Sequence, residues 1–380
     1  MLEGLNKVDW AGLGQGDVPE VLWAVAAADP VTSEENLGGL VGILADQGTR
    51  YAATAPAVPF VAELAMVPKI PDRHWLVEAL TYAAIGSDTY SLPAGIIEGS
   101  FEELARTTNT TGDEERYGRW ALDAYRAVEA AVPALAALLE EDDTQLRRAA
   151  AHLVAWFPRW APMSVPLLRE RLAAEPDPDT KATMLIALGL LAGARGETEH
   201  GPLLVGQLED GDAVVRWAAA VALARVFPQA LPEAAVQELL GWLTDRVDTG
   251  RERRLLFPEP EAYILLVLQD QPVLRERAVV TILDRLPVLS AEAAYVAVSN
   301  LTFLAFEEGQ TVPGTAFADL SLLHQRLFRA LAELPAIWRD DEYPIPPGLP
   351  LLSHWWPDRE STSPEEMSEQ LRAYVAGRLP

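Results

Sequence analysis

Proline recurs in this chain at nearly constant intervals, and each time it stands within or just before an apolar run. Six prolines follow one another at 30 to 40 residues: Pro59, Pro93, Pro133, Pro166, Pro202 and Pro232. A period of this length is typical of proteins built from helical repeats. Because proline is tolerated in the first turn of a helix but not in its interior, we predict that these prolines begin helices.

A second pattern precedes the prolines in the middle of the chain and is aligned on three basic residues, Arg147, Lys181 and Arg216. Apolar residues follow each of them at offsets of three, six, seven and ten, which traces one face of an amphipathic helix. An aspartate stands four residues before each basic residue, where a carboxylate can cap a helix: Asp143, Asp177 and Asp212. The repeat is therefore predicted to be a pair of helices.

A helix pair of this size cannot bury its own apolar face, so neighbouring pairs must stack into one core. We predict an all-α fold, a right-handed α-solenoid of about seven to nine antiparallel helix pairs with essentially no sheet. The solenoid is expected over residues 1–340, with the strongest repeat signal over 130–245. Residues 341–380 are expected to form a proline-rich segment and a capping helix that begins at Pro364.

Three further helices are predicted in the N-terminal part of the chain. One follows Asp17, a second runs from Ser33 to about Gln47, and a third spans residues 72–85 as the first helix of a repeat.

The stretch EDGDAVVRWAAAVALARVFP, followed by a proline-started helix, resembles the HEAT repeat in its short bacterial, PBS-lyase-like form. Tetratricopeptide repeats have a similar period, but their Trp, Gly-Tyr and Ala-Phe positions are missing here. The resemblance implies an armadillo-like superhelix that serves protein–protein interaction. It also implies ladders between repeats, assigned to Asp143, Asp177 and Asp212 with Arg147, Lys181 and Arg216.

Motifs that carry chemistry are missing from the sequence. It contains no cysteine, its five histidines form no close pair, and it has neither a phosphate-binding loop nor a nucleophile elbow. We therefore expect no enzymatic activity, no cofactor and no metal. No signal peptide or membrane span is evident, so we expect a cytoplasmic protein, and the excess of arginine over lysine suggests a GC-rich bacterium.

The net charge of −26 decides which partners are plausible. A groove for nucleic acid needs basic residues, so nucleic acid is an unlikely partner, and a HEAT-like DNA glycosylase is disfavoured. A strongly acidic chain instead attracts a basic protein or peptide. We expect an interaction scaffold or adaptor, with an immunity or antitoxin-like protein that blocks a cationic toxin as the alternative.

The binding surface is expected on the exposed face of the proline-started helices, in a protein that is monomeric. The candidate residues on these helices are Glu63, Arg169, Arg171, Gln207, Glu209, Gln237 and Glu238. A turn rich in arginine, with Arg251, Arg253 and Arg254, is expected near one end. These arginines can hold a carboxylate or another anion, or they can pair with neighbouring acids such as Asp245 and Asp248.

Overall fold

The computed structural model describes most of the chain, in ranges separated by gaps: residues 1–27, 39–46, 48–86, 113–244, 256–257, 260–269, 272–288, 297–298, 301, 304–305, 315–333 and 364–378. The chain is an all-α solenoid, as its repeats predict. Its contacts divide it into two units. Unit 1 comprises residues 1–231 and 249–259, and unit 2 comprises residues 232–248 and 260–380.

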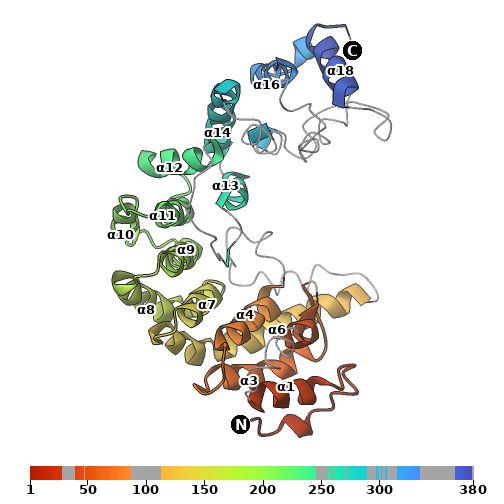
Figure 1. The fold of residues 1–380 in the computed structure, drawn as a ribbon, viewed down its shortest axis with the longest axis vertical. Helices are drawn as coiled ribbons and strands as arrows, with labels where there is room; N and C mark the ends of the chain where they lie inside the picture. The colour runs from red at the N-terminus through yellow and green to blue at the C-terminus, as the bar shows by residue number, and fades with distance from the viewer. Residues whose placement is uncertain are drawn as a thin grey trace. The chain divides into compact units, whose positions relative to one another are not determined.

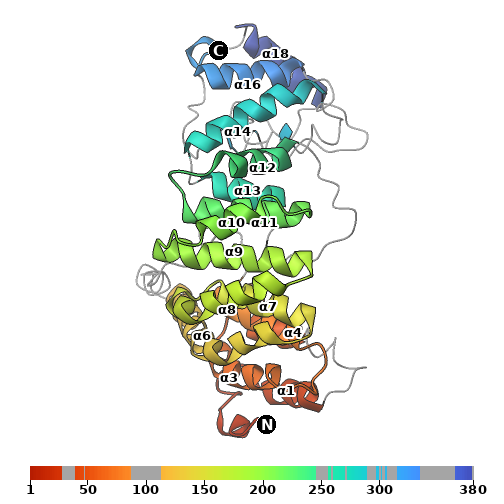
Figure 2. The same cartoon turned by 90° about the vertical axis from the view of Figure 1, so that its left-hand side faces the viewer.

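Unit 1 is a stack of helices in chain order, and Figure 2 shows them following one another up the stack. Its elements are η1 (Leu5–Lys7), α1 (Val18–Ala27), β1 (Ala45–Asp46), β2 (Thr49–Arg50), α3 (Thr54–Ala65), α4 (Arg73–Ile85), α6 (Asp113–Leu135), η2 (Ala136–Glu140), α7 (Thr144–Val154), η3 (Pro158–Trp160), α8 (Ala161–Ala174), α9 (Pro178–Arg195), α10 (Gly201–Gln207) and α11 (Ala213–Val226). In Figure 1, α8 and α10 lie on one side of the stack and α7, α9 and α11 on the other.

The core of unit 1 lies along the first helices of the repeats. The predicted stripes of α7, α9 and α11 are buried at every position. Gly189 of α9 and Ala222 of α11 face each other so closely that a Cβ added to the glycine would lie 2.5 Å from the alanine Cα. The caps are also as predicted, because the side chains of Asp143, Asp177 and Asp212 accept hydrogen bonds from backbone N–H groups in the first turns of these three helices.

The prolines agree with their prediction only in part. Pro202 is the second residue of α10, and Pro232 directly precedes α12 (Glu233–Thr244). In contrast, Pro59 and Pro166 lie inside α3 and α8, and Pro133 lies near the end of α6. Helices α3 and α8 begin one turn earlier than predicted, because Pro56 and Pro162 already occupy their first turns. Pro93 lies outside the described residues.

The N-terminal helices are confirmed in part. Helices α1 and α4 occupy the predicted places, but the helix predicted to reach Gln47 ends earlier. Ala45 and Asp46 instead pair with Thr49 and Arg50 in a short antiparallel ladder, the only β structure among the described residues. Gly48 has a φ of 87°, and this left-handed conformation suits the tight turn between the two short strands.

Unit 2 is also helical where it is described. Its elements are α12 (Glu233–Thr244), α13 (Pro260–Gln269), α14 (Pro272–Arg285), η4 (Leu286–Val288), η5 (Phe317–Asp319), α16 (Leu322–Glu333) and α18 (Pro364–Val375). Arg277 of α14 donates to Glu233 of α12 at 2.8 Å, and the Tyr374 hydroxyl of α18 donates to the Thr315 carbonyl at 2.7 Å. Helix α18 begins at Pro364, as predicted. The domain boundary predicted at residue 340 falls outside the described residues and stays a prediction.

Candidate functional site

Ion pairs connect successive repeats of unit 1, among them Arg148–Asp177. Three others form what we call the ladder: Arg73–Glu141, Arg147–Glu175 and Lys181–Asp210. In each pair, a basic residue at the start of a first helix reaches the turn before the next first helix. The nitrogen–oxygen distances are 3.2, 2.8 and 2.5 Å. These contacts bring the turns before α7, α9 and α11 to one edge of the unit.

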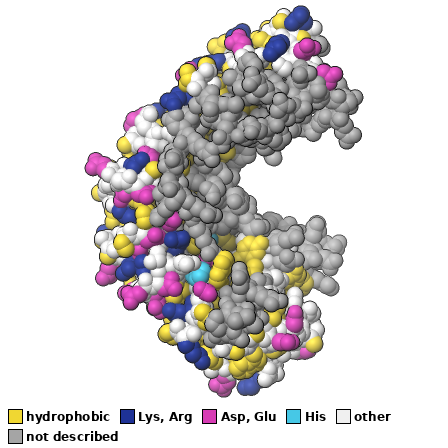
Figure 3. Space-filling model, viewed as in Figure 1, with side chains coloured by type: hydrophobic (Ala, Val, Ile, Leu, Met, Phe, Trp, Pro, Cys, Tyr) yellow, Lys and Arg dark blue, Asp and Glu magenta, His cyan; other side chains and the backbone are white. Residues whose placement is uncertain are grey.

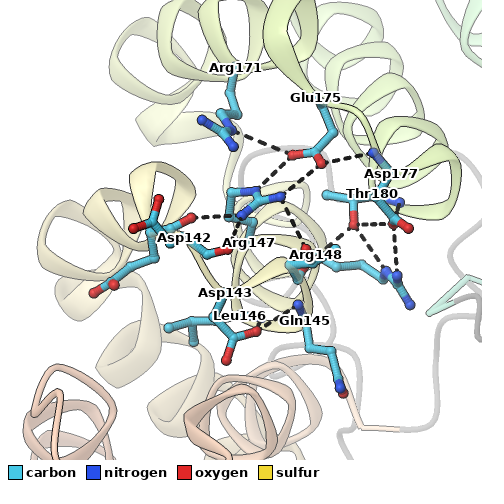
Figure 4. A network of polar contacts seen from close by, with 12 residues as sticks. Asp142, Asp143, Gln145, Leu146, Arg147, Arg148, Arg171, Glu175, Asp177 and Thr180 are labelled. Carbon is cyan, nitrogen blue, oxygen red and sulfur yellow. Dashed lines mark hydrogen bonds and ion pairs between the residues drawn. The ribbon is translucent and has the colours of Figure 1, made fainter.

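The central rung of the ladder is the most buried. Arg147 Nε and an Nη donate to the two carboxylate oxygens of Glu175 at 2.8 and 2.9 Å, and the Glu175 side chain has no exposed surface. The other Nη of Arg147 donates to the carbonyls of Glu141 and Asp142, both at 2.8 Å (Figure 4). Arg147 therefore ties its own turn to the turn of the next repeat.

The carboxylates of the ladder differ from those that the resemblance implied. Asp177 and Asp212 cap their helices, and the carboxylates that Arg147 and Lys181 bind stand two residues earlier, at Glu175 and Asp210. Asp177 instead pairs with Arg148 at 2.9 Å. The physical reason is that the Asp177 oxygen that caps α9 already accepts from the Thr180 N–H and from Arg148, so Arg147 binds the neighbouring Glu175 carboxylate instead.

The sequence reasoning missed the first rung. Arg73 is the first residue of α4, three positions earlier in its helix than Arg147 in α7, and Glu141 stands two residues before the cap Asp143. A signal for this pair was present in the sequence, because an acidic residue two positions before each cap recurs at Glu141, Glu175 and Asp210.

Two ladder carboxyl groups, Glu175 and Asp210, have pKa values below their ordinary ones. Burial alone would raise the pKa of Glu175, but the hydrogen bond from Arg147, the Asp177 N–H and the charges of Arg147 and Arg171 outweigh it. The pKa of Asp210 is likewise lowered, because the Asp212 N–H and Lys181 outweigh its burial. These groups are therefore carboxylates at neutral pH.

The ladder leaves several acidic side chains exposed at the same edge. Glu140 ends η2, Asp142 lies in the turn before α7, and Glu209 lies in the turn before α11. Within the described ranges, none of these three side chains takes part in an ion pair or hydrogen bond. We call Glu140, Asp142 and Glu209 the acidic edge.

The predicted binding residues of unit 1 are only partly available. Arg169 and Glu209 are exposed, whereas Arg171 is 3.5 Å from Glu175 and Gln207 is half-buried. Glu63 is 3.7 Å from the N-terminal ammonium group and accepts a hydrogen bond from Leu2 N–H. The spacing of four residues between Arg171 and Glu175 could have indicated their pairing.

The remaining predicted residues belong to unit 2 or lie outside the description. Gln237 donates to Glu233 at 2.8 Å, and Glu238 accepts from Trp242 Nε1 at 3.1 Å, both within α12. The arginine turn with Arg251, Arg253 and Arg254 is outside the described residues.

Among the described residues, no group of histidine, aspartate and glutamate side chains could hold a metal ion. No described helix has the length and apolarity needed to cross a membrane.

Part of the chain matches a known protein family. Residues 165–256 match the family of HEAT repeats, a segment that begins within α8 and includes α9 to α12. A search of curated proteins finds no match to the chain.

Proposed function

We propose that this HEAT-repeat protein is a non-enzymatic scaffold or adaptor that binds a basic protein or peptide at the acidic edge of unit 1. HEAT repeats commonly mediate protein–protein interactions, which favours a protein partner. The proposal includes a monomeric, cytoplasmic protein, in keeping with a chain that has no cysteine.

The observation that carries this proposal is that basic side chains of unit 1 are paired in the ladder, whereas the side chains of the acidic edge are not. Arg73, Arg147 and Lys181 are engaged in the ladder, and their charges are compensated by the carboxylates that they bind. The acidic edge has no such compensation within the described ranges. Because these basic side chains are paired in the ladder, the negative charges of the acidic edge are left exposed on the surface.

The chemistry of the edge favours a cationic partner over an anionic one. Acidic side chains are visible over the part of unit 1 that holds α8 to α10, with Lys and Arg between them (Figure 3). Exposed carboxylates attract a basic partner over about 10 Å at an ionic strength of 0.1 M, and they repel nucleic acid. Most of the resulting gain is expected in the association rate.

A binding measurement with octa-arginine tests the site. Wild-type protein is compared with Asp142→Lys/Glu209→Lys, and with the control Glu3→Lys/Glu20→Lys, which makes the same change in net charge at exposed positions elsewhere in unit 1. We expect the first pair to weaken binding at least tenfold in low salt, and the control pair to weaken it less than threefold. Equal losses in both variants would show that only net charge matters.

The natural partner is sought by capture from a lysate of the source organism, with wild-type protein and the Asp142→Lys/Glu209→Lys variant as baits. We expect a basic protein that the wild type retains, that the variant releases, and that leaves as salt rises. A partner that is a secreted cationic toxin would favour the immunity role over the adaptor role. Retention by both baits would move the binding surface away from the acidic edge.

A further inference from the structure

An aromatic cluster in unit 1 joins α7 to a residue far along the chain. The ring of Phe257 lies 4.7 Å from the His152 ring, at an interplanar angle of 87°, and 5.9 Å from the Trp156 ring. His152 and Trp156 are themselves 5.8 Å apart in an edge-to-face arrangement. Phe257 belongs to unit 1 by its contacts, although it stands in the sequence just before α13, which belongs to unit 2.

The cluster lies outside the repeat core. The stripe of α7 that packs in the core consists of Leu146, Ala150, Leu153 and Val154, and it continues to Phe157. At 100° per residue, His152 points more than a quarter turn away from this stripe, and Trp156 lies in the turn that follows α7. Both are nevertheless buried, with exposed fractions of 7% and 0%, and the Phe257 ring contacts both of them.

The cluster contains two polar atoms that receive no hydrogen bond from the apolar ring of Phe257. His152 Nε2 and Trp156 Nε1 are buried, and neither has a hydrogen-bond partner in the described structure. An indole N–H can only donate, whereas a neutral imidazole Nε2 donates or accepts according to its tautomer. Phe257 carries no oxygen or nitrogen in its side chain, so the contact leaves both groups unpaired, and a buried polar group without a partner is destabilising.

We propose that His152 and Trp156 form a socket for a tyrosine side chain of a protein partner, and that Phe257 occupies this socket in the free chain. A phenol has the same ring as phenylalanine and adds one hydroxyl group, which both accepts and donates. It can accept from Trp156 Nε1–H and bond His152 Nε2 in either tautomer. A tyrosine therefore supplies the contact that Phe257 makes and the hydrogen bonds that Phe257 lacks.

Phe257 is not part of a helix. Residues 256 and 257 are bends, so Phe257 is held by its side-chain contacts and not by a helical backbone. The socket is separate from the acidic edge, since it lies at the C-terminal end of α7 and the acidic edge lies at helix N-termini. The inference consequently stands without the proposed function.

Small analogues of the two side chains test the socket. p-Cresol represents tyrosine and toluene represents phenylalanine, and both are titrated into wild-type protein and into Phe257→Ala, which leaves an apolar cavity of the kind that binds small aromatic molecules. We expect Phe257→Ala to bind p-cresol at least fivefold more tightly than toluene, and the wild type to bind p-cresol at least tenfold more weakly than Phe257→Ala does.

A second variant assigns the preference to the socket. In Phe257→Ala/Trp156→Phe the indole donor is lost while an aromatic ring is kept, so the preference for p-cresol over toluene should fall to less than twofold. Equal affinities of Phe257→Ala for the two probes, no binding of either, or equal p-cresol binding by wild type and variant would each overturn the proposal. If Phe257→Ala does not fold, Phe257→Leu replaces it with the same criteria.

Discussion

Arg147 and Glu175 form a two-point ion pair between successive repeats, with the carboxylate fully buried. Loss of one partner leaves the other charge buried, which typically costs about 3–5 kcal/mol. We expect Arg147→Met to lower the free energy of unfolding by about that amount, because Glu175 then loses both of its close hydrogen bonds from a guanidinium group. Among the described residues it keeps only the longer contact with Arg171, at 3.5 Å. Urea unfolding measures the loss.

The matched control for this substitution is Arg159→Met. Arg159 also pairs with a glutamate, Glu129, at 3.5 Å, but its side chain is 66% exposed. Exposed pairs contribute about 0–1 kcal/mol, so this variant should stay within about 1 kcal/mol of wild type. Similar losses in the two variants would contradict a special role for the buried rung.

Protonation of His152 should make stability depend on pH in the mildly acidic range. Burial lowers the pKa of His152 from its ordinary 6.5 to about 3. Between these values the unfolded chain binds a proton that the folded chain does not, so stability falls as pH drops below 6.5, by about 1.4 kcal/mol per pH unit. His152→Phe removes this contribution.

The comparison is made by urea unfolding at pH 7.5 and pH 5.0. We expect wild type to lose about 2 kcal/mol more than His152→Phe over this interval. The carboxyl groups of Glu175, Asp177 and Asp210 contribute in a lower pH window, because their lowered pKa values affect stability only below their ordinary values of 4.5 and 3.8. Parallel pH profiles would mean that His152 is protonated in the folded protein.

Asp143 and Asp142 offer a test of the predicted caps, because they are adjacent acids in one turn. The Asp143 carboxylate accepts from the N–H groups of Gln145 and Leu146 at 2.9 and 3.1 Å, whereas the Asp142 side chain is exposed. We expect Asp143→Ala to cost about 1 kcal/mol and Asp142→Ala less than about 0.5 kcal/mol. Both changes remove one negative charge, so a difference in thermal stability between the two variants measures the contribution of the helix cap.

The sequence predicted the parts of this fold that repeat. The stripe after Arg147, Lys181 and Arg216 and the aspartate caps depend on helical spacing, which is visible within one repeat. Proline positions were predicted less well, because a proline in the second turn and one in the first turn look alike when the true helix start is unknown. Pro59 and Pro166 are the examples.

The site residues were harder to predict because their partners lie in other repeats. A basic residue can reach either of two acids in the next turn, and the backbone of that turn decides between Glu175 and Asp177. Phe257 and His152 belong to no common repeat, so the period of the sequence could not predict their contact.

Gly189 and Gly206 provide a pair of identical substitutions with opposite expected effects. A Cβ on Gly189 of α9 would lie 2.5 Å from Ala222 Cα and 2.6 Å from its Cβ in α11, and backbone atoms cannot yield as a flexible side chain does. Gly189→Ala must push the two helices apart and should cost about 1–3 kcal/mol. The same change at Gly206 of α10 meets no atom within 4 Å, and it should gain up to about 1 kcal/mol because alanine favours the helix. Thermal unfolding of the two variants beside wild type measures both effects. A neutral Gly189→Ala would mean that α9 and α11 are not packed as closely as the repeat core requires.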